Sequence, residues 1–129
     1  MRKCLAAFII MTIIFIPKVY SAENAEDTKR FYEKVVQIQP SNGNAHFDLG
    51  NVYLREKRYD DALAQYIKAG KLGLAAIRMD SYYFNMAVCY SGLGRMDDAI
   101  RSLEKCVKAN PKNREAKDLL NIYKNQSSP

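Results

Sequence analysis

The sequence repeats itself after 37 residues, and this internal repeat constrains the fold more than any other feature. A repeat period between about 20 and 50 residues is typical of solenoids, in which one supersecondary unit stacks on the next. The matched pairs are His46 with Tyr83, Leu49 with Met86, Gly50 with Ala87, Tyr53 with Tyr90, Ala62 with Ala99, Tyr66 with Leu103, and Ala69 with Cys106. The sequence therefore predicts two stacked copies of one unit.

Apolar residues within each copy recur with the period of an amphipathic helix. Each copy contains two such stripes separated by a short break, at Lys57-Arg58 in the first copy and at Gly92-Leu93-Gly94 in the second. Glycine favours the left-handed dihedrals that end helices. Each copy is therefore predicted to be an antiparallel helical hairpin, and no strand is needed to account for the chain. The expected fold class is all-α, an α-solenoid.

These stripes resemble the tetratricopeptide repeat, whose pattern is a large residue, x2, Leu-Gly, x2, Tyr, then Ala, x3, an aromatic residue and a final Pro. The first copy carries it as His46-x2-Leu49-Gly50-x2-Tyr53 and Ala62-x3-Tyr66, and the second ends it with Pro111. Leu74 stands where the first copy would have proline. The family period is about 34 residues, so the longer offset predicts an extended helix end or a wider turn within Gly70–Met79.

The repeat pattern divides the chain into segments. We predict a half-repeat helix in residues 22–42, two full repeats in residues 43–76 and 80–113, a capping helix in residues 114–125, and a frayed tail in residues 126–129. Lys117, Asn121 and Lys124 stand where a further repeat would need core side chains. A polar outer face of this kind suits a helix that caps a solenoid.

Residues 1–21 have the composition of a secretory signal peptide. Arg2 and Lys3 precede an apolar stretch from Leu5 to Ile16, which as a helix would rise only about 18 Å against roughly 30 Å of hydrocarbon. We expect cleavage between Ser21 and Ala22, a periplasmic or secreted mature protein, and no stable membrane insertion after cleavage. The alternative is an uncleaved signal that tethers the domain to the inner membrane.

Composition argues against a nucleic-acid-binding protein and against an enzyme. Outside residues 1–21, 17 Lys and Arg face 14 Asp and Glu, too small an excess for a nucleic-acid partner. The sole histidine, His46, lies in a core stripe and is expected to pack or hydrogen-bond between helices. No phosphate-binding loop, catalytic triad or zinc spacing occurs. We therefore expect no catalytic residues, no metal and no cofactor.

Two further residue groups receive structural interpretations. Asp60-Asp61 and Asp97-Asp98 open the second helix of each copy, where carboxylates complement the helix dipole. Cys89 and Cys106 lie at different heights on their hairpin, an axial mismatch of roughly 10 Å, whereas a disulfide needs Cα atoms within about 7 Å. Both cysteines are predicted to be reduced and buried.

The family resemblance implies a concave groove lined by the first helices of the repeats. The positions that match groove positions are Asn44, Phe47, Asn51, Leu54, Arg55, Ser81, Phe84, Asn85, Val88 and Ser91. Asn51 and Asn85 match two positions of the clamp with which some members grip a terminal carboxylate, but Phe47, Glu115 and Leu119 replace its basic residues. This argues against carboxylate-clamp specificity. Phe47 and Phe84 are either apolar anchors for a partner or packing residues between helices.

The sequence therefore predicts an exported, non-catalytic adaptor or assembly factor, a scaffold that binds an extended or helical segment of a protein partner. The rival interpretation is a structural subunit that stacks end to end into a homo-oligomer through its exposed solenoid ends.

Overall fold

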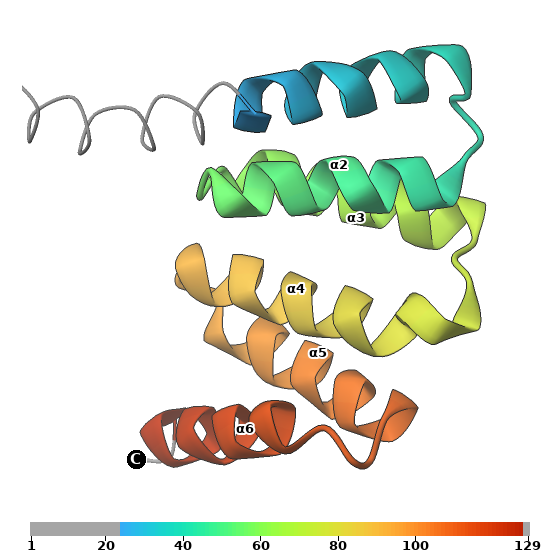
Figure 1. Cartoon of the computed structure of the whole chain (residues 1–129). Coiled ribbons are helices and arrows are strands. Elements are labelled where there is room, and N and C mark those ends of the chain that lie inside the picture. Colours follow the sequence, from blue (N-terminus) through green and yellow to red (C-terminus); the bar gives the residue numbers. More distant parts are fainter. Residues whose placement is uncertain (1–23, 128–129) are drawn as a thin grey trace, which may run out of the picture.

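The computed structural model describes residues 24–127, and all regular secondary structure in that range is helical (Figure 1). A first helix, here the N-terminal helix, occupies residues 24–38. It is followed by α2 (Gly43–Arg55), α3 (Tyr59–Leu72), the short 3₁₀ helix η1 (Ala76–Arg78), α4 (Met79–Gly92), α5 (Met96–Ala109) and α6 (Arg114–Ser127). None of these helices is long and apolar enough to cross a lipid bilayer. The predicted all-α fold is confirmed for the described residues, and the predicted signal peptide lies outside them.

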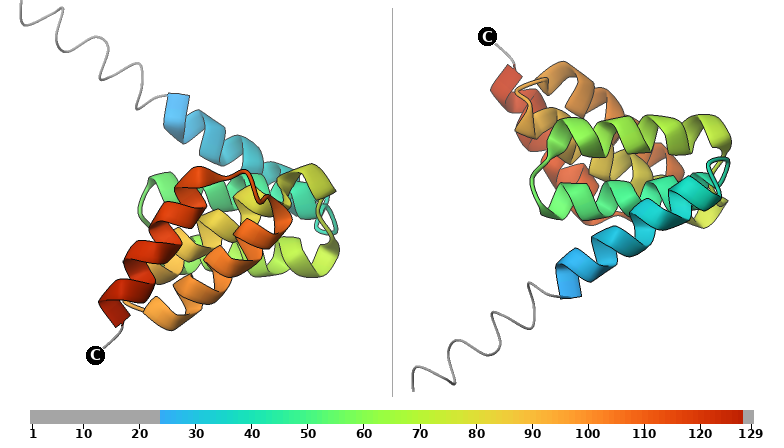
Figure 2. Two further views of the ribbon diagram at one scale, coloured as in Figure 1. Left: turned by 90° about the horizontal axis from the view of Figure 1, so that it is seen from below. Right: turned by 90° about the horizontal axis from the view of Figure 1, so that it is seen from above.

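The helices stack in chain order from the N-terminal helix to α6 (Figure 1). Two antiparallel hairpins, α2 with α3 and α4 with α5, form the centre of the stack. α4 packs on both helices of the preceding hairpin, and α6 packs on α5. The N-terminal helix and α6 cover opposite ends of the molecule (Figure 2). This arrangement is the predicted α-solenoid.

The turn inside each hairpin has the same construction in both repeats. Lys57 and Gly94 adopt positive φ angles of 58° and 72° at equivalent positions, the left-handed conformation that reverses a chain at the end of a helix. An arginine follows in each turn and pairs with an aspartate in the first turn of the next helix. The pairs are Arg58 with Asp61 and Arg95 with Asp98, each 2.7 Å apart. The structural interpretation of these aspartates is confirmed.

Close helix crossing depends on matched residue sizes at the centre of each hairpin. Gly50 lies against the fully buried Tyr66, and a Cβ atom at Gly50 would come within 2.6 Å of the Tyr66 ring. At the equivalent position of the second hairpin, Ala87 shares a buried cluster with the smaller Leu103. The larger aromatic partner therefore requires glycine, whereas the aliphatic partner leaves room for a methyl group.

α4 links the two repeats because it is buried on two sides. Its Tyr82 and Cys89 belong to the core of the first hairpin, whereas its Ala87 belongs to the core of the second. Burial on both sides explains why α4 has no single apolar stripe, unlike the one-sided helices. The two repeats therefore share a continuous core.

The connection between α3 and α4 contains the extra residues that the 37-residue offset predicts. α3 ends at Leu72 and α4 begins at Met79, so residues 73–78 join the repeats and include η1. The corresponding connections, residues 39–42 and 110–113, are shorter. Gly73 has a φ of 96°, which turns the chain at the end of α3. The wider turn is confirmed.

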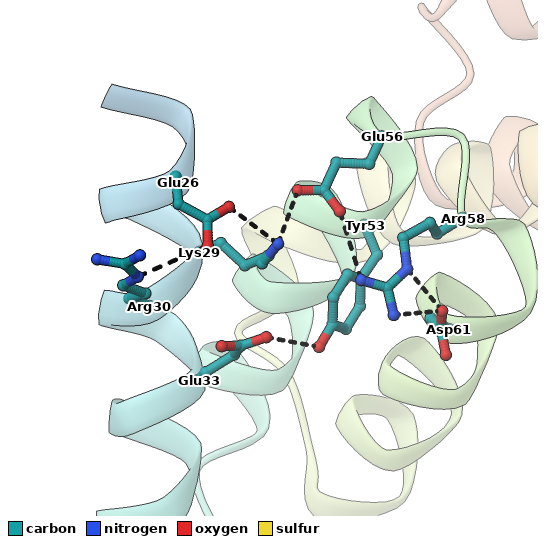
Figure 3. Close-up of polar contacts among 8 residues, drawn as sticks. All are labelled: Glu26, Lys29, Arg30, Glu33, Tyr53, Glu56, Arg58 and Asp61. Atoms are coloured by element: carbon teal, nitrogen blue, oxygen red, sulfur yellow. Dashed lines mark hydrogen bonds and ion pairs between the residues drawn. The ribbon is translucent and has the colours of Figure 1, made fainter. Parts of the chain in front are cut away.

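Polar contacts attach the N-terminal helix to the first hairpin (Figure 3). Lys29 Nζ lies 3.5 Å from a carboxylate oxygen of Glu56, and the Tyr53 hydroxyl donates to Glu33 Oε1 over 3.1 Å. Burial, followed by the neighbouring Glu33, raises the pKa of Tyr53, so the phenol keeps its proton. Contacts of this kind at a solvated surface orient the helix more than they stabilise it.

α6 closes the other end of the stack. Ala116 is fully buried against the second hairpin, while Lys117, Asn121 and Lys124 are exposed. The helix extends to Ser127, beyond the predicted end at residue 125, so part of the predicted frayed tail is helical. The outer face of α6 is therefore mostly polar, as expected of a cap, although Ile122 on the same helix is 50% exposed.

The two cysteines are buried as separate thiols. Cys89 and Cys106 are both fully buried and form no disulfide, as predicted. Burial raises the pKa of Cys89 to about 12 and also raises the pKa of Cys106. A thiol rather than a thiolate is thus present near neutral pH, and these side chains act as small apolar core residues.

Substituting Gly50 tests the size-matched crossing. We expect Gly50→Ala to lower the free energy of unfolding by about 1–3 kcal/mol, because the methyl group displaces Tyr66 from a filled core. This loss exceeds the gain of up to about 1 kcal/mol from the better helix former. Chemical denaturation measures the difference.

The double variant Gly50→Ala, Tyr66→Leu is the matched control. It reproduces the Ala87 and Leu103 combination of the second hairpin and is expected to recover part of the lost stability. A Gly50→Ala variant as stable as the parent chain would contradict the size-matching explanation.

Candidate functional site

A groove of about 360 Å³ lies where the N-terminal helix, α2 and α4 meet. Its lining combines one apolar, one aromatic, two amide and two charged side chains. The lining residues are Tyr32, Asp48, Asn51, Leu54, Arg55 and Asn85. Three successive layers of the solenoid therefore contribute to one surface, which we call the α2–α4 groove.

An amide pair forms the centre of the α2–α4 groove. Asn51 Oδ1 accepts a hydrogen bond from the Tyr66 hydroxyl and another from Asn85 Nδ2, both at 2.8 Å. Burial raises the pKa of Tyr66, which keeps its hydroxyl a donor. The core thereby fixes the orientation of Asn51, and Asn51 in turn fixes Asn85 across the boundary between repeats.

This pair leaves one amide nitrogen and one amide oxygen without a partner. Within residues 24–127, Asn51 Nδ2 and Asn85 Oδ1 have no hydrogen-bond partner, and neither atom is buried. A peptide backbone presents a complementary N–H and C=O at each residue. The pair is thus oriented to bond a backbone laid along the groove.

The charged side chains of the groove differ in their pairing. Asp48 forms an ion pair of 2.6 Å with Arg78, which η1 supplies from the long connection between the repeats. Arg55 is exposed and has no carboxylate partner among the described residues. The groove therefore offers one unneutralised positive charge beside the apolar side chain of Leu54.

Four of the ten predicted groove residues line the groove, namely Asn51, Leu54, Arg55 and Asn85. Phe47 does not, because only 5% of it is exposed and its ring packs on Tyr66 at a centroid distance of 5.7 Å. The structure thus supports the packing interpretation of Phe47, and its ring is not free to act as an anchor.

The remaining predicted residues lie outside the groove lining. Phe84 is half-buried against the core of the second hairpin, here called the second core cluster (Ala87, Ala99, Leu103, Cys106 and Ala116). The half-buried Ser91 accepts a hydrogen bond from the Tyr123 hydroxyl. Asn44 and Val88 are half-buried, and Asn44 Oδ1 is buried without a partner among the described residues. Ser81 is exposed. Leu119, which stands where a carboxylate clamp would have a basic residue, packs on the second core cluster.

Two residues that line the groove, Tyr32 and Asp48, were not predicted from the sequence. Tyr32 comes from the N-terminal helix, and the repeat pattern of this helix did not show that it lies beside the first helix of the first repeat. Asp48 lies three residues before Asn51 on α2, so helical spacing puts both on one face of that helix, and its carboxylate bonds Arg78. Helical spacing within α2 could therefore have found Asp48, whereas Tyr32 depends on a contact between layers that a single-repeat pattern does not encode.

The structure provides no chemistry for catalysis at His46. His46 is 6% exposed, its Nε2 donates to the Pro40 carbonyl over 3.0 Å, and its Nδ1 lies 2.8 Å from Gln65 Oε1. It therefore packs and hydrogen-bonds between elements, as predicted. Within residues 24–127 no group of His, Cys, Asp and Glu side chains is arranged to hold a metal ion.

Comparison with known proteins places this geometry in a family. Residues 20–73 and 80–113 each match a family model described as tetratricopeptide repeat. Hsp70-Hsp90 organizing protein 2 of Arabidopsis thaliana is 32% identical over 87 residues, which are 67% of this chain and 15% of that protein. The chain thus spans less than a fifth of the length of this curated relative.

Solved structures share the fold at lower identity. The first TPR of Spaghetti (RPAP3) bound to the HSP90 peptide SRMEEVD superimposes with a TM-score of 0.72 at 18% identity, over 85% of each chain. The Yersinia enterocolitica type III secretion chaperone SycD, in complex with a peptide of the translocator YopD, has a TM-score of 0.67 at 18% identity, over 84% of this chain and 86% of that one. These structures show the shared fold, and the two family models, which together span both hairpins, show that the chain belongs to the tetratricopeptide-repeat family.

Proposed function

We propose that this chain is a non-catalytic interaction module that binds a segment of a protein partner in the α2–α4 groove. The observation that carries the proposal is the oriented amide pair Asn51 and Asn85, whose free donor and acceptor face the groove. The partner's backbone bonds this pair and an apolar side chain contacts Leu54. Arg55 favours an acidic or neutral residue in the segment, because a cation beside it would be repelled.

Peptide complexes of proteins with the same fold support a peptide-binding role. Both RPAP3 and SycD carry bound peptides in the structures described above, on the same fold. The basic residues of a carboxylate clamp are absent here, since Phe47 is in the core and Leu119 of α6 packs against the core of the second hairpin. We therefore assign recognition to an internal segment of the partner rather than to a free chain terminus.

Replacing Asn85 tests the groove. A photo-crosslinking residue in place of the exposed Arg55 identifies the bound segment, which is then synthesised as a peptide. We expect Asn85→Ala to weaken the affinity for that peptide about fivefold to tenfold, because the hydrogen bond from the peptide to Asn85 Oδ1 is lost.

Asn121→Ala is the matched control, because it removes the same amide group from an exposed position on α6, outside the groove. The affinity of this variant for the peptide should equal that of the parent chain. Thermal melting of all variants shows whether a loss of affinity results from a loss of folding. Unchanged affinity in a folded Asn85→Ala variant would refute the α2–α4 groove as the binding site.

We place the module outside the cytoplasm as part of the same proposal, on the strength of the signal-like composition of residues 1–21. N-terminal sequencing of the protein from fractionated cells tests this. A first residue of Ala22 in the periplasmic or secreted fraction is the expected result. An intact N-terminus in the membrane fraction would indicate a tethered protein, and an intact N-terminus in the cytoplasm would overturn the assignment.

A second candidate function is self-assembly through the ends of the stack. Exposed apolar side chains favour it at both ends: Phe31 is 61% and Ile38 67% exposed on the N-terminal helix, and Ile122 is 50% exposed on α6. The two ends differ, so contact between them is head to tail and propagates into open chains. Light scattering is expected to show a mass that rises with concentration if this occurs, whereas a constant monomer mass excludes it.

A further inference from the structure

We propose that the chain has a second docking site, a cleft between α3 and α5 that takes an acidic segment of a protein partner with an apolar anchor side chain. The cleft encloses about 630 Å³. It shares no lining residue with the α2–α4 groove, so the inference goes beyond the function proposed above and does not depend on it.

The cleft lies at the extra residues between the two repeats. Among the described helices, α3 packs on α2 and α4 but makes no extensive contact with α5. One end of the opening is lined by Gly73 and Leu74 of the long connection and by Met79 at the start of α4. The extra residues that lengthen this repeat beyond the family period of about 34 thus lie next to an opening between α3 and α5, the second helices of the two hairpins.

The floor of the cleft is apolar and adaptable. α4 supplies Met79, Tyr82 and Met86 to it. Gly70 of α3 lets the Tyr82 side chain approach the helix closely, because a Cβ atom at that position would clash with the Tyr82 hydroxyl oxygen. Methionine adjusts to ligand shape, and tyrosine offers a large rigid surface with a polar tip, which is why both occur often at binding surfaces.

The rim of the cleft is positively charged. The lining includes three cations, Lys71, Arg101 and Lys105, and one carboxylate, that of Asp98. Asp98 is already paired with Arg101 and with Arg95. Neither Lys71 nor Lys105 has a carboxylate partner among the described residues, and Lys105 Nζ instead lies 5.7 Å from the centroid of the Tyr83 ring. Two unneutralised cations thus flank an apolar floor.

These features define the chemistry of the occupant. Along α5 the lining runs from Asp98 to Lys105, a length of about 10 Å at the helical rise. This length suits one or two turns of a helix or a short extended segment. An apolar side chain fills the floor, and flanking Asp or Glu residues bind the two lysines, which steer the segment and fix its register.

Peptide display provides the probe, because no partner sequence has to be assumed. Random peptides are selected on the parent chain, with removal of those that also bind the double variant Lys71→Glu, Lys105→Glu. Peptides that bind the α2–α4 groove are removed by this step, since both proteins retain that groove. The expected survivors carry an aromatic or aliphatic residue flanked by Asp and Glu.

Affinities of the surviving peptides decide the outcome. We expect the Lys71→Glu, Lys105→Glu variant to bind at least tenfold more weakly than the parent chain. The matched control is Lys68→Glu, Lys108→Glu, which reverses the charge of exposed lysines on the same two helices outside the cleft lining. This control should stay within twofold of the parent.

Methyl resonances of methionine locate the peptide independently. Binding in the cleft is expected to shift the signals of Met79 and Met86, whereas Met96, which packs on the second core cluster, should stay unchanged. The proposal is overturned if no peptide prefers the parent chain, if the preferred peptides are basic, if the control loses as much affinity, or if the two methionine signals do not move. Asn85→Ala is expected to leave this binding unaffected, so failure here and failure of the α2–α4 groove are distinguishable.

Discussion

The close crossing of paired helices is the constraint on which the rest of this structure depends. Gly50 meets the Tyr66 ring, and Ala87 shares its core with Leu103. Because these residues are small, the helices of each hairpin approach far enough to bury a continuous apolar seam. The seam holds α2 and α4 in place, and these two helices carry the α2–α4 groove. A wider crossing would remove both the core and the geometry of that surface.

Tyr66 connects folding to binding. Its ring fills the core opposite Gly50, while its hydroxyl donates to Asn51 at the groove. Burial keeps the hydroxyl protonated, so the bond that orients Asn51 persists throughout the neutral pH range. Asn51 then orients Asn85 of the next repeat. The groove is thus preorganised by the core, which reduces the entropy lost when a partner binds.

The long connection between α3 and α4 affects both faces of the solenoid. On one face, η1 supplies Arg78, which pairs with Asp48 in the α2–α4 groove. On the other face, the same connection borders the cleft between α3 and α5. The few residues by which this repeat exceeds the family period therefore distinguish the chain from a regular repeat array at two separate surfaces. Solenoids accommodate such insertions because each repeat contacts only its neighbours.

The amino-acid sequence was sufficient to predict the helices, their pairing into hairpins, the small residues at the crossings, the burial of His46 and the cysteines, and the position of the wider turn. These features follow from local periodicity and residue size, which a repeat displays twice. The tertiary structure alone decided which side chains share a surface. Phe47 and Asn51 lie one helical turn apart, yet one enters the core and the other the groove. Tyr32 lines the groove only because the N-terminal helix packs beside the first hairpin, and such contacts between layers depend on geometry that periodicity does not specify.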